Sequence, residues 1–198
     1  MQNDEVWMRL ALQEARLAAA EGEIPVGAVL VRDGQEICRA HNLRENQHDP
    51  TAHAEILCMR RGAEKLGTWR LRGCTLYVTL EPCPMCAGAM VMSQLSACVY
   101  GAADARQGCC GSVYDLPGDA ALSGVTAWRA GVLADECAEV MRGFFAKKRI
   151  NPYHSVESGI QFRPGLPPDA GEVRGEYCRL YYFQIRMRQD APRIFHSG

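Results

Sequence analysis

Two short segments of the sequence hold side chains that could bind a metal ion. One is His53-Ala54-Glu55, and the other runs from Pro82 to Cys86 and spaces two cysteines as C-x-x-C. Three protein ligands with a fourth position left for water are typical of a catalytic zinc, whereas a structural zinc takes four protein ligands. The residue types therefore predict a zinc site made by His53, Cys83 and Cys86, with the fourth position left for chemistry.

The cysteine pair alone has other interpretations. A C-x-x-C segment can be redox-active or can form half of a four-cysteine zinc site, and the sequence holds no second C-x-x-C to complete such a site. A thiol redox protein would also leave His53 and Glu55 unexplained. Several of the ten cysteines lie in apolar runs and are expected to pack as small hydrophobic residues, namely Cys38, Cys58, Cys74, Cys98 and Cys137.

Glu55 is the candidate general acid and base. A carboxylate beside a zinc-activated water can take a proton from it and return that proton to the substrate. Side chains two positions apart on a regular helix point about 200° apart, so His53 and Glu55 can face one metal only where a helix begins. Pro50 and Thr51 are residues that favour such a helix start.

The elements that must position these residues follow from periodicity and turn signals. Apolar spacing predicts helices that begin near residue 4, near residue 50, at Pro82 and at residue 133, the last running to residue 149. Gly22 and Gly67 are placed to end the first two. Strands are expected over residues 27–31, 35–40, 75–79, 97–100 and, on a weaker signal, 125–128, with Asp33-Gly34 as the turn of a hairpin.

Alternating strands and helices predict one α/β layered domain with a mixed sheet over residues 1–150. The last 48 residues have a different character, with five prolines, five glycines and no lysine. We expect residues 151–198 to form a mostly irregular C-terminal extension with at most one strand, in the aromatic run 177–187.

A family resemblance sharpens this interpretation. H-x-E followed by P-C-x-x-C is the signature of zinc deaminases. Between residues 7 and 149, the sequence resembles the bacterial tRNA-specific adenosine deaminases in the segments EIPVGAVLV, AHN, DPTAHAEI, LYVTLEPCPMCAGAM, CVYG, GAADARQG and GVLADECAEVMRGFF. The resemblance implies a three-layer cytidine deaminase-like fold, in which helices flank a mixed five-stranded sheet. It also implies one zinc ion per subunit and a homodimer that converts adenosine to inosine at the wobble position of a tRNA anticodon.

The resemblance also assigns roles to residues. His53, Cys83 and Cys86 match the zinc ligands, and Glu55 matches the residue that moves the proton. The residues that match substrate-binding positions are Asn42, at the purine edge, and Val26 and Phe145. Asn42 also has a plain interpretation as a turn residue after a strand.

A cationic cluster closes the predicted domain. Lys147, Lys148 and Arg149 could contact the phosphates of an anticodon stem, but cations at a helix C-terminus are equally expected from the helix dipole. The net charge of −1 argues against a surface that is basic throughout, so contact with RNA must come from a local patch.

The sequence argues against some other classes of protein and leaves one alternative enzyme. The sequence has no long apolar run, so it predicts no export signal and no membrane span, and we expect a cytoplasmic protein. A guanine or other free-purine deaminase of the same fold is the alternative, because such enzymes share DPTAHAE and EPCPMC. A catalytically silent deaminase-like subunit would be expected to lack the carboxylate, and Glu55 is present.

Overall fold

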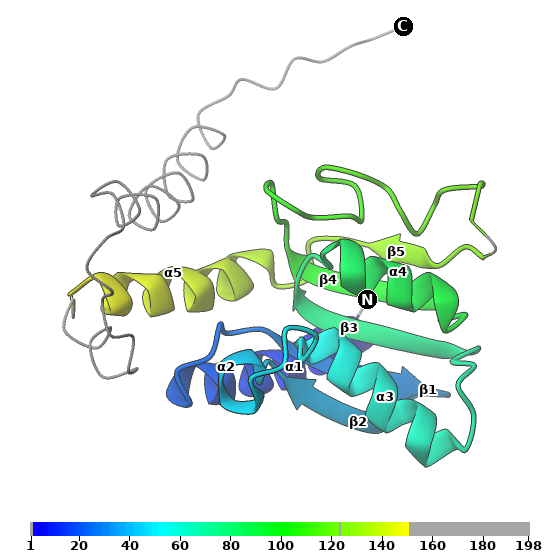
Figure 1. Cartoon of the computed structure of the whole chain (residues 1–198), viewed down its shortest axis with the longest axis horizontal. Helices are drawn as coiled ribbons and strands as arrows, with labels where there is room; N and C mark the ends of the chain where they lie inside the picture. Colours follow the sequence, from blue (N-terminus) through cyan, green and yellow to red (C-terminus); the bar gives the residue numbers. More distant parts are fainter. Residues whose placement is uncertain (1, 123, 151–198) are drawn as a thin grey trace, which may run out of the picture. The chain divides into compact units, whose positions relative to one another are not determined.

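The computed structural model describes residues 2–122 and 124–150. Helices and strands are interleaved along this part of the chain, as expected for an α/β domain (Figure 1). The helices are α1 Gln2–Ala20, α2 Arg44–Gln47, α3 Ala54–Leu66, α4 Pro84–Met92 and α5 Ala134–Ile150. The strands are β1 Gly27–Arg32, β2 Gln35–His41, β3 Cys74–Leu80, β4 Ala97–Ala102 and β5 Ala127–Arg129.

The strands form a five-stranded sheet in the order β2-β1-β3-β4-β5. β1 pairs antiparallel with both β2 and β3, whereas β3, β4 and β5 run parallel. The β1–β2 hairpin turns at Asp33 and Gly34, whose φ angles of 51° and 72° are those of the turn that matches the twist of paired strands. The predicted mixed five-stranded sheet is therefore confirmed.

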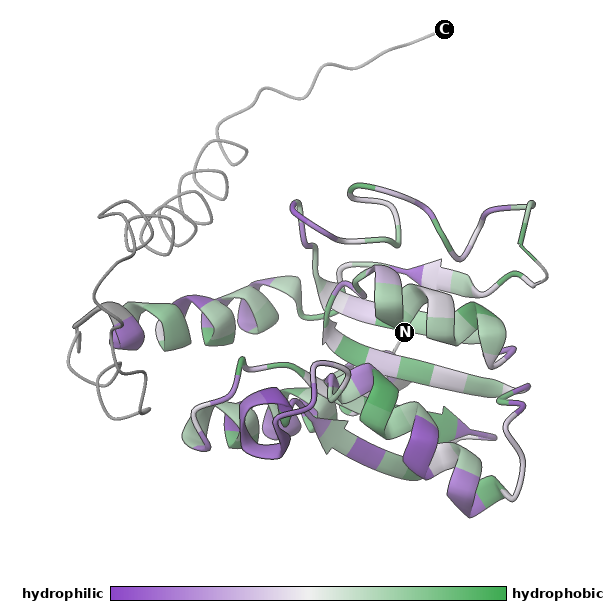
Figure 2. Ribbon diagram, viewed as in Figure 1, coloured by the Kyte–Doolittle hydropathy of each residue, from purple (hydrophilic) through white to green (hydrophobic). Residues whose placement is uncertain are grey.

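The two faces of the sheet bury different helices. Successive strand residues point to opposite faces, so Leu30 and Leu76 pack with α3 and α4, while Val29 and Tyr77 pack with α1. Figure 2 shows that the central strand β3 is hydrophobic or neutral along its length, while α3 alternates hydrophilic and hydrophobic bands. These packing relationships give the three-layer arrangement that the family resemblance implied.

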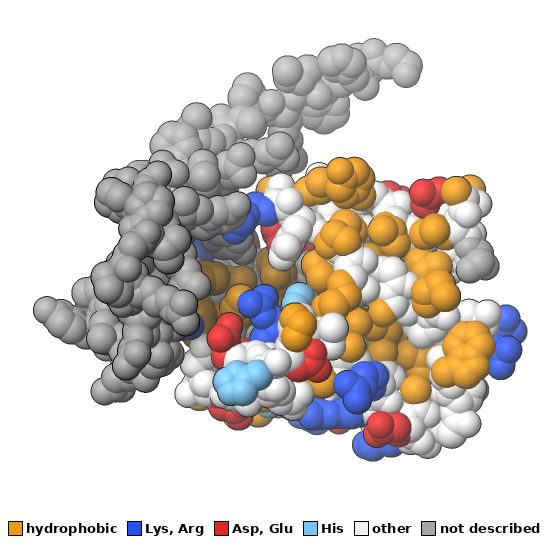
Figure 3. All heavy atoms as spheres, viewed as in Figure 1, with side chains coloured by type: hydrophobic (Ala, Val, Ile, Leu, Met, Phe, Trp, Pro, Cys, Tyr) orange, Lys and Arg blue, Asp and Glu red, His pale blue; other side chains and the backbone are white. Residues whose placement is uncertain are grey.

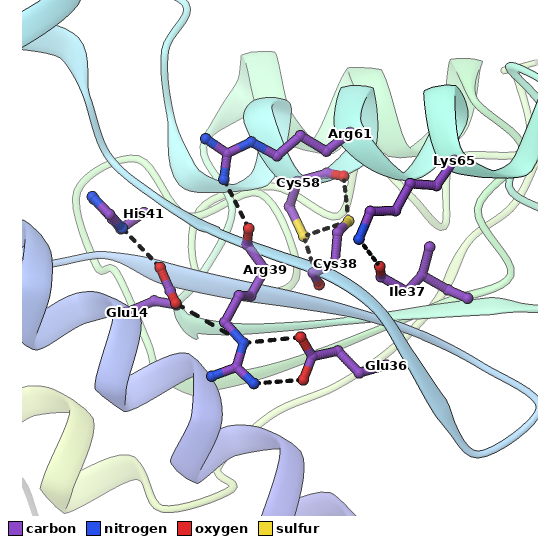
Figure 4. A network of polar contacts seen from close by, with 9 residues as sticks. All are labelled: Glu14, Glu36, Ile37, Cys38, Arg39, His41, Cys58, Arg61 and Lys65. Atoms are coloured by element: carbon purple, nitrogen blue, oxygen red, sulfur yellow. Dashed lines mark hydrogen bonds and ion pairs between the residues drawn. The ribbon is translucent and has the colours of Figure 1, made fainter.

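The edge strand β2 is covered by side chains from α3. Edge strands expose backbone groups that invite pairing with other chains. Here Arg61 donates to the backbone oxygen of Arg39 at 2.9 Å, and Lys65 donates to that of Ile37 at 2.8 Å (Figure 4). These two bonds tie α3 to the sheet, and α3 begins at the candidate metal site.

Two helices begin later than the sequence predicts. At residues 49–51 the Asp49 carboxylate accepts the Thr51 backbone N–H at 2.8 Å, so the chain forms a side-chain-stabilised turn and α3 begins only at Ala54. α4 begins at Pro84 and not at Pro82, because Cys83 has an extended backbone and forms the N-cap, so that Pro84 takes the first helical position, which needs no N–H.

Smaller differences concern β5 and α2. β5 begins at Ala127, where the backbone first pairs with Ser96, and not at residue 125. The short helix α2 has no counterpart in the prediction, because its four residues carry no apolar periodicity. The predicted extension 151–198 lies outside the described residues. Among the residues described, no helix is long and apolar enough to cross a membrane.

Candidate metal centre and active site

The candidate ligands lie where two helices begin. His53 is the N-cap of α3, with φ −75° and ψ 150°, and Cys83 is the N-cap of α4, with φ −73° and ψ 173°. Cys86 lies in the first turn of α4 and is buried. A helix N-terminus favours negative charge through its free N–H groups and its dipole. Both helix starts are therefore suited to stabilise thiolates beside an imidazole.

The three ligand atoms are spaced for one metal ion. His53 Nδ1 lies 3.7 Å from Cys83 Sγ and 3.6 Å from Cys86 Sγ, and all three ligand atoms lie within 4.8 Å of one another. Tetrahedral zinc, with Zn–N and Zn–S distances of about 2.0 and 2.3 Å, would separate nitrogen from sulfur by about 3.5 Å. The predicted ligand set is thus brought together from two helices at a separation that fits zinc.

The side chains of His53, Cys83 and Cys86 differ in how readily they lose a proton. Hydrogen bonding from Cys86 and from His53 lowers the pKa of Cys83 to about 4, although burial opposes the shift. The pKa of Cys86 is raised well above its usual range, first by its hydrogen bond with Cys83 and then by burial. The hydrogen bond with Cys83 also raises the pKa of His53. Cys83 therefore carries the thiolate to which the other two side chains donate.

Glu55 lies in the first turn of α3 and is buried. Burial raises the pKa of its carboxyl group, and the charges of Cys83 and His53 act on that pKa in opposite directions. Within the part of the chain that the structure describes, its Oε2 atom is buried and has no hydrogen-bond partner. A buried oxygen without a partner is costly, and a proton-transfer role needs an oxygen that can still form a hydrogen bond.

Asn42 and Val26 lie beside the start of α3. The Asn42 side chain is buried, and its Oδ1 accepts the backbone N–H of Ala54 at 2.8 Å. The backbone N–H of Asn42 donates to the oxygen of Val26 at 3.1 Å. Val26 belongs to the same hydrophobic cluster as Ala54, and Phe145 packs against that cluster from α5. Asn42 thus bonds directly to Val26 and to the start of α3, whereas Phe145 is related to them only through the hydrophobic cluster.

The predicted cationic cluster is only partly described. Lys147 and Lys148 are exposed, and the side chain of Arg149 lies outside the described part. Lys148 Nζ donates to the backbone oxygen of Gly22 at 3.2 Å and lies 4.7 Å from the centre of the Phe144 ring. Lys148 therefore also stabilises the turn after α1.

Sequence reasoning missed Glu81, a buried carboxylate two residues before Cys83. It accepts hydrogen bonds from a loop that follows β4. A glutamate at the end of a buried strand was the available signal, because charged side chains are rarely buried without a partner.

Comparison with known proteins agrees with this geometry. A family model described as the cytidine and deoxycytidylate deaminase zinc-binding region matches residues 1–102. The tRNA-specific adenosine deaminase of Bacillus subtilis is 47% identical over 149 residues, covering 75% of this chain and 92% of the relative. That of Haemophilus influenzae is 48% identical over 147 residues, covering 74% and 85%.

Solved structures show the same pattern of similarity. A structure from studies of A-to-I editing by tRNA:A34 deaminases at the wobble position of transfer RNA has a TM-score of 0.66 and 42% identity, covering 68% of this chain and 97% of that one. A guanine deaminase from Nitrosomonas europaea has a TM-score of 0.62 and 26% identity, covering 71% and 83%. Among these, sequence similarity is greater to the proteins described as tRNA deaminases.

Proposed function

Because the chain belongs to the family of tRNA-specific adenosine deaminases, we propose that it converts adenosine to inosine at the wobble position of a tRNA anticodon. The observation that carries this proposal is the position of Glu55 beside the cluster of His53, Cys83 and Cys86, with one buried oxygen that has no partner in the described structure. This arrangement matches what hydrolytic deamination requires, namely a metal site and an adjacent group that transfers protons.

We assign the metal to His53, Cys83 and Cys86, with one zinc ion per subunit. A zinc ion held there supplies Lewis-acid chemistry, which makes water a nucleophile near neutral pH. Glu55 accepts a proton from the attacking water, whose oxygen bonds to C6, and passes this proton to the purine ring. It then moves the second proton, from the new C6 hydroxyl group, to the amino group, so that the C6–N bond breaks, ammonia leaves and inosine remains. The burial of Glu55 keeps bulk water from competing for this proton.

We assign recognition of the purine edge to Asn42. Its Oδ1 is already used by the backbone N–H of Ala54, so the Nδ2 group is left as the donor for an acceptor on the base. We assign apolar contacts with the substrate to Val26, which belongs to the same hydrophobic core cluster as Ala54, and to Phe145, which packs against that cluster. Because the oxygen and the NH2 group of the amide have different partners, one side chain can both support the start of α3 and orient the substrate.

The remaining assignments concern the RNA, the domain organisation and the location of the protein. We propose that Lys147, Lys148 and Arg149 form a local phosphate-binding patch at the end of α5. The deaminase domain comprises residues 1–150, with residues 151–198 as an appended extension, and the protein acts in the cytoplasm.

We propose a homodimer that uses the α3–α4 face. Figure 3 shows hydrophobic side chains gathered over this face, and Trp69 and Met92 are 54% and 68% exposed. A groove on this face is lined mainly by the apolar side chains of Ile56, Met59, Ala63, Trp69, Leu71 and Ala89, together with Arg60 and Ser93. A contiguous exposed apolar surface of this kind is typical of an interface. Sedimentation of the zinc-loaded protein should show two chains per particle. Met92→Glu places a charge in the proposed interface and should shift the equilibrium from dimer toward monomer.

The activity is tested on RNA and on free purines in parallel. Zinc-loaded protein is incubated with tRNA transcripts that carry A at the wobble position, with the same transcripts carrying G there, and with free guanine and adenine. Inosine formed only in the first set supports the proposal. Xanthine from guanine without inosine in any tRNA would instead identify a free-purine deaminase.

A further inference from the structure

The buried side chain of Glu81 accepts four hydrogen bonds, all from one loop. Its side chain is 2% exposed. Its Oε2 accepts the backbone N–H of Asp104 at 2.9 Å, and its Oε1 accepts those of Cys110 and Ser112 at 2.9 and 3.0 Å. The Ser112 hydroxyl also donates to Oε2. Four donors meet two oxygens, which is the full capacity of a carboxylate and not of a carboxamide.

These donors belong to the loop between β4 and β5, at residues 104–112. The buried backbone N–H groups of this loop have no partner in a sheet or helix and need other acceptors. Gly108 packs directly on the carboxyl group of Glu81, so that a Cβ at this position would collide with it. Glu81 therefore provides the acceptors that a helix or sheet would otherwise provide for these N–H groups, and it determines the conformation of the loop.

The same loop contacts the segment that carries the candidate zinc ligands. Pro82 and Cys83 follow Glu81 in the chain, and the backbone N–H of Cys109 donates to the oxygen of Pro82 at 2.8 Å. The tip of the loop is exposed and includes Arg106 and Gln107. Side chains of these types bind phosphates and base edges of nucleic acids.

We propose that Glu81 is a positioning residue for the deamination, which rests on the proposed function. Its carboxylate joins the ligand segment and the 104–112 loop into one rigid unit, so that a nucleic-acid substrate meets a loop already in place. A loop that is ordered only part of the time binds more weakly, in proportion to the competent fraction. Loss of the Glu81 bonds should therefore act mainly on substrate affinity.

The first test uses Glu81→Gln, which keeps the side-chain size but replaces one acceptor oxygen with an NH2 group that faces donors. Hydrogen exchange followed by mass spectrometry should show faster exchange across residues 104–112, with zinc content unchanged. The KM for tRNA should rise on the order of tenfold while kcat stays within about threefold. Glu14→Gln, at a buried carboxylate on α1, is the matched control and should leave KM unchanged.

A second pair of variants, with a smaller change, tests the same proposal if Glu81→Gln does not fold. Ser112→Ala removes only the hydroxyl bond to Glu81, and should raise exchange in the loop and KM for tRNA by about threefold. Ser96→Ala is its control, because that hydroxyl accepts the Gly73 backbone N–H at the opposite end of β4.

The outcomes separate this inference from the proposed function. A faster-exchanging loop together with a raised KM supports the positioning role. A lower melting temperature with unchanged KM and unchanged exchange in the loop would overturn it, because Glu81 would then only stabilise the fold. If the unsubstituted protein makes no inosine in any tRNA, the proposed function fails, and with it the effect on KM. The exchange measurement then still decides whether Glu81 holds the loop.

Discussion

The side-chain oxygen of Asn42 accepts the backbone N–H of Ala54 at 2.8 Å, between the proposed ligand His53 and the proposed proton-transfer residue Glu55. The first N–H groups of a helix have no partner within the helix, so this bond caps α3 from a different segment. One amide group therefore fixes the part of the backbone from which two functional side chains extend.

Asn42→Asp should separate the two roles of this side chain. Aspartate retains an oxygen for the Ala54 N–H but lacks the NH2 donor, so the bond to α3 and the zinc content should hold while deamination falls on the order of 10²-fold. Asn42→Ala should in addition lower the free energy of unfolding by about 1–3 kcal/mol, because a buried N–H is left unpaired. Inosine formation and thermal melting measure both. Full activity of Asn42→Asp would refute purine recognition by Asn42.

Glu55→Gln should abolish turnover and leave the site otherwise intact. The amide cannot carry the proton, so inosine formation should fall by a factor of about 10² or more. Burial raises the pKa of Glu55, which means that its ionised form is disfavoured in the folded protein, and a neutral glutamine should not lower the melting temperature. Zinc analysis is the control. Retained turnover would show that another group moves the proton.

Zinc binding to the metal-free protein should release more than one proton per site at pH 7. Cys86, with its pKa raised well above the usual range, carries a proton that zinc displaces, and the raised pKa of His53 leaves it partly protonated. Cys83 contributes none, because its pKa is about 4. Zinc affinity should consequently weaken as pH falls, first through Cys86 and then also through His53. Calorimetry in buffers of different ionisation enthalpy counts the protons, and fewer than one would contradict this assignment.

Replacing Lys147, Lys148 and Arg149 by glutamine should weaken tRNA binding and reduce its salt dependence. Each lost phosphate contact removes about 0.7 to 0.9 from the slope of log affinity against log salt concentration. Lys148→Gln alone should also lower stability slightly, because its bond to Gly22 is lost. Filter binding over a series of salt concentrations is the measurement, and an unchanged slope would count against the patch.

Truncation after Ile150 should leave zinc content and the rate of tRNA deamination unchanged. The residues proposed to bind the metal, bind the purine and move the proton all lie before this point. Solubility or assembly is expected to respond instead, since the aromatic run 177–187 is lost. If activity on tRNA falls while zinc stays bound, the six arginines between residues 163 and 193 would have to be counted in the RNA site.

Local features of the sequence were sufficient for the types of all helices and strands except α2, and for the choice of candidate ligands. Asp33-Gly34 predicts the hairpin, and the apolar spacing after residue 133 predicts α5, because turn chemistry and helical period act over a few residues. The requirement that His53 lie where a helix begins also followed from geometry within one turn. Helix starts were less certain, and the Asp49 turn delayed α3 because a side chain competed for the backbone.

The meeting of distant groups depended on the tertiary structure. His53 and Cys83 are 30 positions apart, and they approach only because α3 and α4 lie on the same face of a sheet whose strand order no local pattern encodes. The same holds for Glu81, whose donors come from 23 to 31 positions along the chain. Sequence alone determined which side chains can bind zinc and move protons, because those are properties of single residues and short spacings. Their burial, their hydrogen bonds and the oxygen of Glu55 that lacks a partner depend on contacts between separate elements, and only folding decides those.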